Sequence, residues 1–113
     1  MNEYKMASLN ARNKAFPFIV NGKIYEVDII YKFYLNGRTA IALVDEFGER
    51  VATATVNLLD AELPNDDEHD YVLIKTWSEN ENMLDFLIKN GIVEDMGIDV
   101  PTGFVKARLV KLI

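Results

Sequence analysis

Hydrophobic and polar positions follow a helical period in only one stretch of the chain, residues 76–91. Apolar residues recur there at intervals of three and four, which places them on one face of a helix. They are Met83, Leu84, Phe86, Leu87 and Ile88. A helix over about 78–90 has roughly three turns and is too short to be stable alone. Its apolar face therefore predicts a second layer against which it packs.

Both ends of this helix carry local signals. Ser78 suits the N-cap position, and Glu81 three residues later completes the pattern of a capping box. Gly91 suits the left-handed position that follows a helix, with Lys89 in the last turn. The sequence thus predicts a helix that begins at Ser78 and ends before Gly91.

Alternating or wholly apolar runs predict six strands elsewhere in the chain. They cover residues 16–20, 24–35, 38–45, 50–58, 71–74 and 104–113. Asn21-Gly22 and Asn36-Gly37 are hairpin signals, since both residues tolerate positive φ. Pro17 has no backbone N–H to donate and places the first strand at a sheet edge.

The segments around the last strand are less regular. Residues 91–100 indicate a short extended piece with a turn near Gly97, and Pro101-Thr102-Gly103 indicates another turn. Phe104 then begins the final strand, and we expect its side chain in the core. Val110 and Leu112 break the alternation, which predicts a bulge or burial of both faces at the end of the strand.

These elements predict an α+β fold, in which a strongly curved antiparallel sheet or partly open barrel of about six strands carries one helix. Weak periodicity over residues 1–15 predicts a frayed N-terminal arm. We expect residues 16–113 to form a single globular domain, because the chain has 113 residues.

Composition narrows the class of protein. Half of the residues are hydrophobic and none is cysteine, which excludes disulfides and thiolate metal sites. No apolar run is long enough to span a bilayer. The first residues lack the basic and apolar regions of a signal peptide. We therefore expect a cytoplasmic protein without a membrane partner.

The charge is unevenly distributed along the chain. Eighteen acids and twelve bases give a net charge of −6, and six of the acids lie within residues 60–70. They are Asp60, Glu62, Asp66, Asp67, Glu68 and Asp70. The rest of the chain has twelve acids against twelve bases, so this stretch carries the whole imbalance. An acidic surface repels phosphate, which argues against direct nucleic-acid binding and favours a basic protein partner.

Catalytic chemistry has little support in the sequence. The one histidine, His69, lies among the acids, and Ser78 is already accounted for as a helix cap. Residues 66–70 offer oxygen ligands for Ca²⁺ or Mg²⁺ but lack the spacing of a calcium-binding loop, so a solvated charge run is the preferred interpretation. No glycine-rich phosphate loop is present. The sequence predicts no enzyme, cofactor or metal.

Three pieces of the second half carry a resemblance. They are Trp77-Ser78-Glu79-Asn80-Glu81-Asn82-Met83-Leu84, Gly91-Ile92-Val93 and Val100-Pro101-Thr102-Gly103-Phe104-Val105. Over residues 71–113 the chain resembles a family of short uncharacterised bacterial proteins encoded on conjugative plasmids, integrative elements and phages. The resemblance implies accessory cargo of a mobile element and brings no catalytic residues.

The leading hypothesis is a small non-enzymatic protein that binds a basic protein partner through residues 60–70. An inhibitor of a host defence nuclease, of the restriction or CRISPR type, fits this hypothesis because such nucleases carry basic nucleic-acid channels. The alternatives are a structural or assembly module that acts through a sheet edge and, ranked last, a metal-dependent enzyme.

Overall fold

The computed structural model describes residues 15–64 and 66–113, which form two antiparallel four-stranded sheets and one short α-helix. The first sheet contains, in spatial order, β1 (Phe16–Val20), β2 (Lys23–Phe33), β3 (Thr39–Val44) and β4 (Arg50–Thr53). The second contains β5 (Thr55–Val56), β6 (Tyr71–Ile74), β8 (Val105–Leu112) and β7 (Val93–Thr102). The α+β class is confirmed, whereas the single sheet of about six strands is wrong. The arm expected over residues 1–15 lies, apart from Ala15, outside the described residues.

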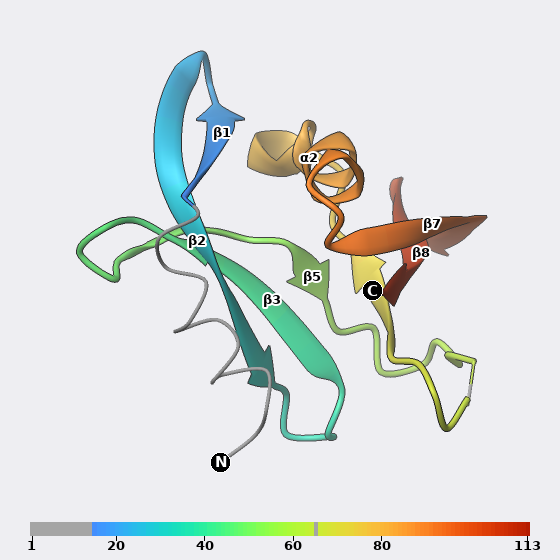
Figure 1. Cartoon of the computed structure of the whole chain (residues 1–113). Coiled ribbons are helices and arrows are strands. Elements are labelled where there is room, and N and C mark those ends of the chain that lie inside the picture. The colour runs from blue at the N-terminus through green and yellow to red at the C-terminus, as the bar shows by residue number, and fades with distance from the viewer. Residues whose placement is uncertain (1–14, 65) are drawn as a thin grey trace.

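One bent segment, residues 50–56, joins the two sheets and explains the error. The N–H of Ala54 donates to the carbonyl of Ile41 in β3 (2.8 Å), and the Ala54 carbonyl accepts from the N–H of Lys75 after β6 (2.9 Å). The segment that the sequence predicts as one strand therefore belongs to the first sheet before Ala54 and to the second sheet after it. The outer strands β1 and β7 are not paired with each other within the described residues, so the sheets do not close into a barrel (Figure 1).

The strand β7 is longer than the sequence predicts. Residues 93–102 pair with β8 along their length, and the register shifts between Asp95 and Ile98. Gly97 adopts φ +74° within this bulge. The glycine therefore marks an irregularity inside a continuous strand, which local signals do not distinguish from a turn.

The helical region agrees with most of its predicted apolar face, but Ile88 is 40% exposed and the predicted start is wrong. The α-helix α2 (Met83–Lys89) buries Met83, Phe86 and Leu87, and a 3-10 turn η1 (Ser78–Asn80) precedes it. Ser78 has φ +60° and caps neither element, so the capping box with Glu81 is absent.

A tertiary contact explains this difference. The side chain of Asn80 is fully buried, and its Nδ2 donates to the carbonyl of Thr53 at the bend between the sheets (2.7 Å). This contact fixes residues 78–82 in a turn and delays the start of the α-helix.

The end of α2 follows its local signal. Gly91 has φ +71°, its N–H donates to the carbonyl of Ile88, and the N–H of Ile92 donates to the carbonyl of Leu87. These two bonds are those of a Schellman motif. The predicted glycine position after the helix is therefore confirmed.

The second sheet is buried on both faces. One face joins the main core, together with α2 and the first sheet, through Val72, Ile74, Val110 and Leu112. The other face presents Leu73, Ala107 and Leu109 to a smaller cluster. The predicted burial of both faces at the end of the last strand is confirmed.

Phe104 lies outside both clusters, contrary to the expectation of a core residue. Thr102 pairs with Val105, so Gly103 and Phe104 are the two central residues of a tight hairpin turn. Gly103 has φ +62°, which is the conformation required at the first position of a type II′ turn. The side chain of Phe104 therefore projects from the tip of the hairpin and is fully exposed to solvent.

Candidate functional site

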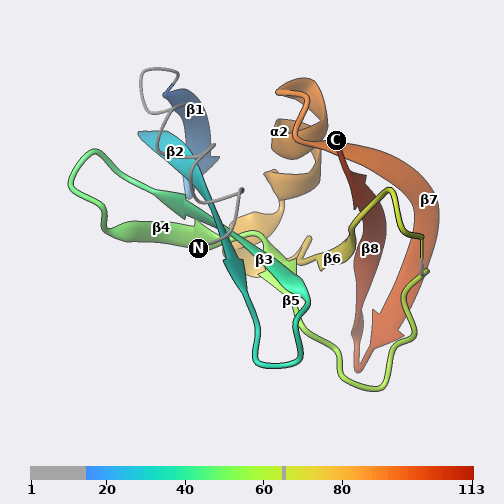
Figure 2. The same cartoon turned by 60° about the horizontal axis from the view of Figure 1, so that its bottom comes forward.

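The acidic connector, residues 57–70, links β5 to β6 and covers the outer face of the second sheet (Figure 2). Its apolar side chains pack against the buried residues that this face presents. These are Leu58, Ala61 and Leu63 from the connector, and Leu73, Ala107 and Leu109 from the sheet. The connector therefore packs on a small core of its own, and most of its acidic residues are left on the outside.

Arg38 holds the first half of the connector in place. Its guanidinium donates through Nη1 to the carbonyl of Leu58 (2.8 Å) and through Nη2 to the carbonyl of Ala61 (2.6 Å). The neighbouring Asn36 donates from Nδ2 to Oδ1 of Asn57 (3.3 Å). The β2–β3 hairpin thus clamps the connector from the side of the first sheet.

Asp66 organises the second half. Its Oδ1 accepts from the N–H of Glu68 (2.9 Å), and its Oδ2 lies 2.7 Å from Nδ1 of His69. The Glu68 N–H, followed by the His69 side chain, holds the pKa of Asp66 below its ordinary value. Asp66 is therefore the acceptor around which the connector turns back toward β6.

Asp70 has a similar internal role. It is half-buried, and its Oδ2 accepts from Oγ1 of Thr39 (3.4 Å). Its backbone carbonyl accepts from the N–H of Leu112 (2.8 Å). Asp70 joins the end of the connector to the first sheet through its side chain and to β8 through its backbone.

The six predicted acids therefore separate into two sets. Asp66 and Asp70 accept hydrogen bonds within the fold, although Asp66 is itself exposed, and the other four side chains are also exposed. The exposed set, defined here without the hydrogen-bonded Asp66, is Asp60, Glu62, Asp67 and Glu68. Over residues 15–64 and 66–113, no group of three or more His, Asp or Glu side chains is placed to hold a metal ion.

An open hollow of about 370 Å³ lies between the connector and the β2–β3 hairpin. Its walls include Arg38, Thr39, Asp66, His69 and Tyr71. The Asp66–His69 pair resembles half of a proton relay, but among the described residues that line the hollow there is no serine or cysteine to act as a nucleophile. The polar side chains of its walls are suited to recognise a polar group of a ligand.

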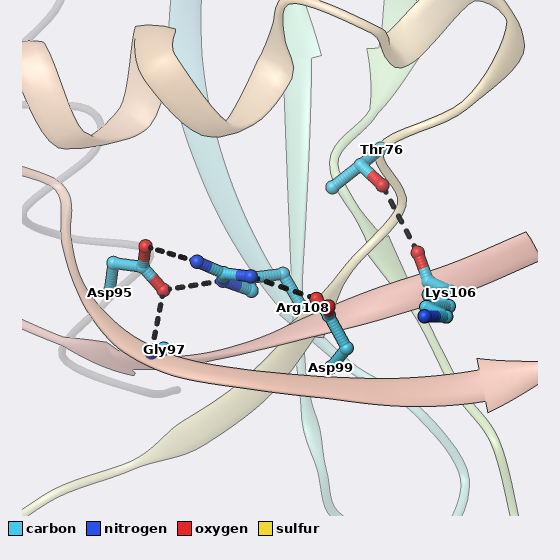
Figure 3. Close-up of polar contacts among 6 residues, drawn as sticks. All are labelled: Thr76, Asp95, Gly97, Asp99, Lys106 and Arg108. Atoms are coloured by element: carbon cyan, nitrogen blue, oxygen red, sulfur yellow. Dashed lines mark hydrogen bonds and ion pairs between the residues drawn. The ribbon is translucent and has the colours of Figure 1, made fainter.

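A second polar cluster surrounds Arg108 on β8 (Figure 3). Its guanidinium forms a bidentate ion pair with Asp95, in which Nε donates to Oδ1 (2.8 Å) and Nη2 donates to Oδ2 (3.0 Å). Nη1 donates to Oδ1 of Asp99 (2.8 Å), and the N–H of Gly97 donates to Oδ1 of Asp95 (2.9 Å). These bonds span the bulge of β7, so we assign Arg108 a structural role.

Sequence patterns miss the residues that position the connector. Arg38 follows a turn and carries no local signal, because its two carbonyl partners lie twenty and more positions away. Phe104 had a signal in Gly103, whose left-handed conformation suits a two-residue turn.

Comparison with protein-family models, curated proteins and solved structures finds no match to this chain. Within the part of the chain that the structure describes, no helix has both the length and the apolar character to cross a membrane.

Proposed function

We propose that this protein is a non-enzymatic binding protein whose acidic connector docks on a basic surface of a partner protein. The observation that carries the proposal is the distribution of charge. The net charge of −6 resides in residues 60–70, and five of the six acids there are exposed on a connector that Arg38 clamps.

Fixed charges favour binding more than mobile ones do. A clamped connector loses less conformational freedom when it binds, so more of the electrostatic attraction appears as affinity. Concentrated charge of one sign also steers a partner of opposite charge and speeds association. The proposal therefore predicts fast, salt-sensitive binding.

The partner that fits this surface is a protein with a cationic channel for nucleic acid. The resemblance of residues 71–113 to proteins of conjugative elements and phages gives a setting in which such a partner is a host defence nuclease, of the restriction or CRISPR type. An acidic protein that occupies the channel competes with the phosphates of the nucleic acid and inhibits the nuclease.

The test is a charge-neutral variant of the exposed set, with Asp60→Asn, Glu62→Gln, Asp67→Asn and Glu68→Gln combined. Tagged protein is used to capture partners from bacterial lysate at low salt, and the affinity for each captured protein is then measured over a range of salt concentrations. We expect the variant to bind at least tenfold more weakly at low salt and to show a shallower salt dependence.

A matched control removes the same charge elsewhere. Four exposed glutamates outside the connector are replaced by glutamine, which changes the net charge by the same amount: Glu26, Glu46, Glu49 and Glu81. Binding should be nearly unchanged in this control. The proposal is wrong if low-salt capture recovers nothing, or if both variants lose affinity equally, since net charge alone would then explain the loss.

Assembly through a sheet edge is the weaker alternative, because the edges of both sheets carry features that oppose strand addition. The edge strand β1 contains Pro17, and β7 contains both a bulge and Pro101. The other two edges, β4 and β5, have four and two residues. Concentration-dependent sedimentation of the protein would favour this alternative.

A metal-dependent enzyme is a further alternative with its own test. Titration with Ca²⁺, Mg²⁺ or Mn²⁺ should move the NMR resonances of residues 66–70 if these residues bind the ion. Unmoved resonances would remove this alternative.

A further inference from the structure

The tip of the β7–β8 hairpin exposes an aromatic ring that the fold does not use. Phe104 is 108% exposed at a turn position where the backbone places no demand on its side chain. A phenylalanine side chain left in water forgoes the stabilisation that burial of its ring would provide. A fully exposed ring at a hairpin tip is therefore suited to contact another molecule.

An apolar groove begins beside this tip. It lies between residues 57–61 of the acidic connector and residues 100–102 of β7, and has a volume of about 480 Å³. Its lining includes the apolar residues Leu58, Leu59, Val100 and Pro101, and Leu59 is itself 73% exposed. The volume falls within the range of about 300–1,000 Å³ that is typical of ligand pockets.

Acidic residues adjoin the groove on the side of the connector. Asp60 lines it directly, and Glu62 follows two residues later with an exposed side chain. An apolar centre beside carboxylates resembles the arrangement of protein interfaces, in which a buried anchor is surrounded by polar groups.

We infer that this groove is the apolar subsite for the partner and receives a bulky apolar side chain from a segment that also carries lysine or arginine. The inference rests on the proposed function, because the acids of the connector select the basic segment. Leu59 contacts the apolar side chain within the groove, and Phe104, two positions after the lining residue Thr102, contacts the partner segment beside it. The charges set the rate and salt dependence of binding, and the apolar contact sets the lifetime of the complex.

The experiment is affinity selection of a random dodecapeptide library on the wild-type protein, followed by affinity measurement with the enriched peptides. We expect enriched peptides to combine lysine or arginine with a leucine or an aromatic residue. In NMR titrations they should shift the amides of residues 58–61 and 100–104.

Two variants separate a specific apolar contact from nonspecific hydrophobic binding. The double variant Leu59→Ser with Phe104→Ser should bind the enriched peptides at least tenfold more weakly, while keeping their salt dependence. The matched control Phe47→Ser, at the tip of the β3–β4 hairpin and 82% exposed, should change affinity less than twofold. All three side chains are exposed, so both variants should fold.

The outcomes distinguish the inference from the function on which it rests. Enriched peptides that are basic without an apolar residue, or that bind the double variant as well as wild type, overturn the subsite and leave the acidic docking surface intact. Enriched peptides without basic residues, or no enrichment, overturn the subsite, and capture from lysate with the charge-neutral variant then decides separately whether the acidic docking surface stands. Shifts confined to other parts of the surface also overturn the subsite.

Discussion

Replacing Arg38 by methionine should loosen the acidic connector and destabilise the whole protein. The substitution keeps an unbranched side chain but removes both hydrogen bonds to the carbonyls of Leu58 and Ala61. A hydrogen bond from a charged donor contributes about 1.5–3 kcal/mol. The side chain of Arg38 is only half-buried, and water can replace part of each bond.

We therefore expect Arg38→Met to lower the free energy of unfolding by about 2–3 kcal/mol. For a domain of this size the loss corresponds to a decrease in Tm of about 8–12 °C. Urea denaturation and a thermal melt measure these two quantities. Arg38→Lys should lie in between, because an ammonium group lacks the fork that reaches both carbonyls at once.

Hydrogen exchange gives a local readout of the same change. The N–H of Ala61 donates to the carbonyl of Leu58 (3.0 Å), one of the two groups that Arg38 holds. Exchange at Ala61 should become faster in Arg38→Met. The matched control is Arg50→Met, on the exposed edge strand β4, which should change the free energy of unfolding by less than about 0.5 kcal/mol.

The clamp is refuted if Arg38→Met loses no more stability than Arg50→Met, or if the Ala61 amide is equally protected in both. The same variant also tests the link to function. A loosened connector should bind the basic partner more weakly even though all of its acids are present.

Three other substitutions test separate parts of the structure. Asp95→Asn should make the free energy of unfolding less dependent on pH in the acid range. Hydrogen bonds from Arg108 hold the pKa of Asp95 below its ordinary value, so its stabilisation is present above about pH 4 and is lost as the pH falls through the lowered pKa. Urea denaturation of both proteins from pH 6 to pH 2 measures the difference. Phe104→Ser should leave the free energy of unfolding within about 0.5 kcal/mol of wild type, whereas a loss of about 3–5 kcal/mol would place the ring in the core after all. Asn80→Ala should lower the free energy of unfolding by about 1–2 kcal/mol, because it removes the part-buried hydrogen bond to the carbonyl of Thr53. An unchanged denaturation midpoint would show that the contact is unimportant.

The sequence alone determined those features whose causes lie within a few residues. Asn21 and Gly22 have φ +50° and φ +78°, as their hairpin turn requires, and Gly91 ends the helix in a left-handed conformation. Most of the apolar face of the helix was predicted correctly, because a 3.6-residue period depends only on spacing, although Ile88 is exposed. The acidic stretch was likewise visible from composition.

Tertiary structure decided the features that depend on distant partners. The residue type of Ser78 and its spacing from Glu81 favour an N-cap at Ser78. The contact between Asn80 and Thr53 nevertheless makes the helix begin at a later residue. In the sequence, the acids of β7 look like residues of a solvated turn. Only the structure shows that they pair with Arg108 on the neighbouring strand.

The features of the candidate site also divide into those that the sequence indicates and those that only the tertiary structure reveals. Sequence supplied the six acids, but only the fold shows that Asp66 and Asp70 are engaged internally and that Arg38 clamps the connector. The physical reason is that charge and period are properties of short segments. Hydrogen-bond partners and exposure instead depend on which segments the sheets bring together.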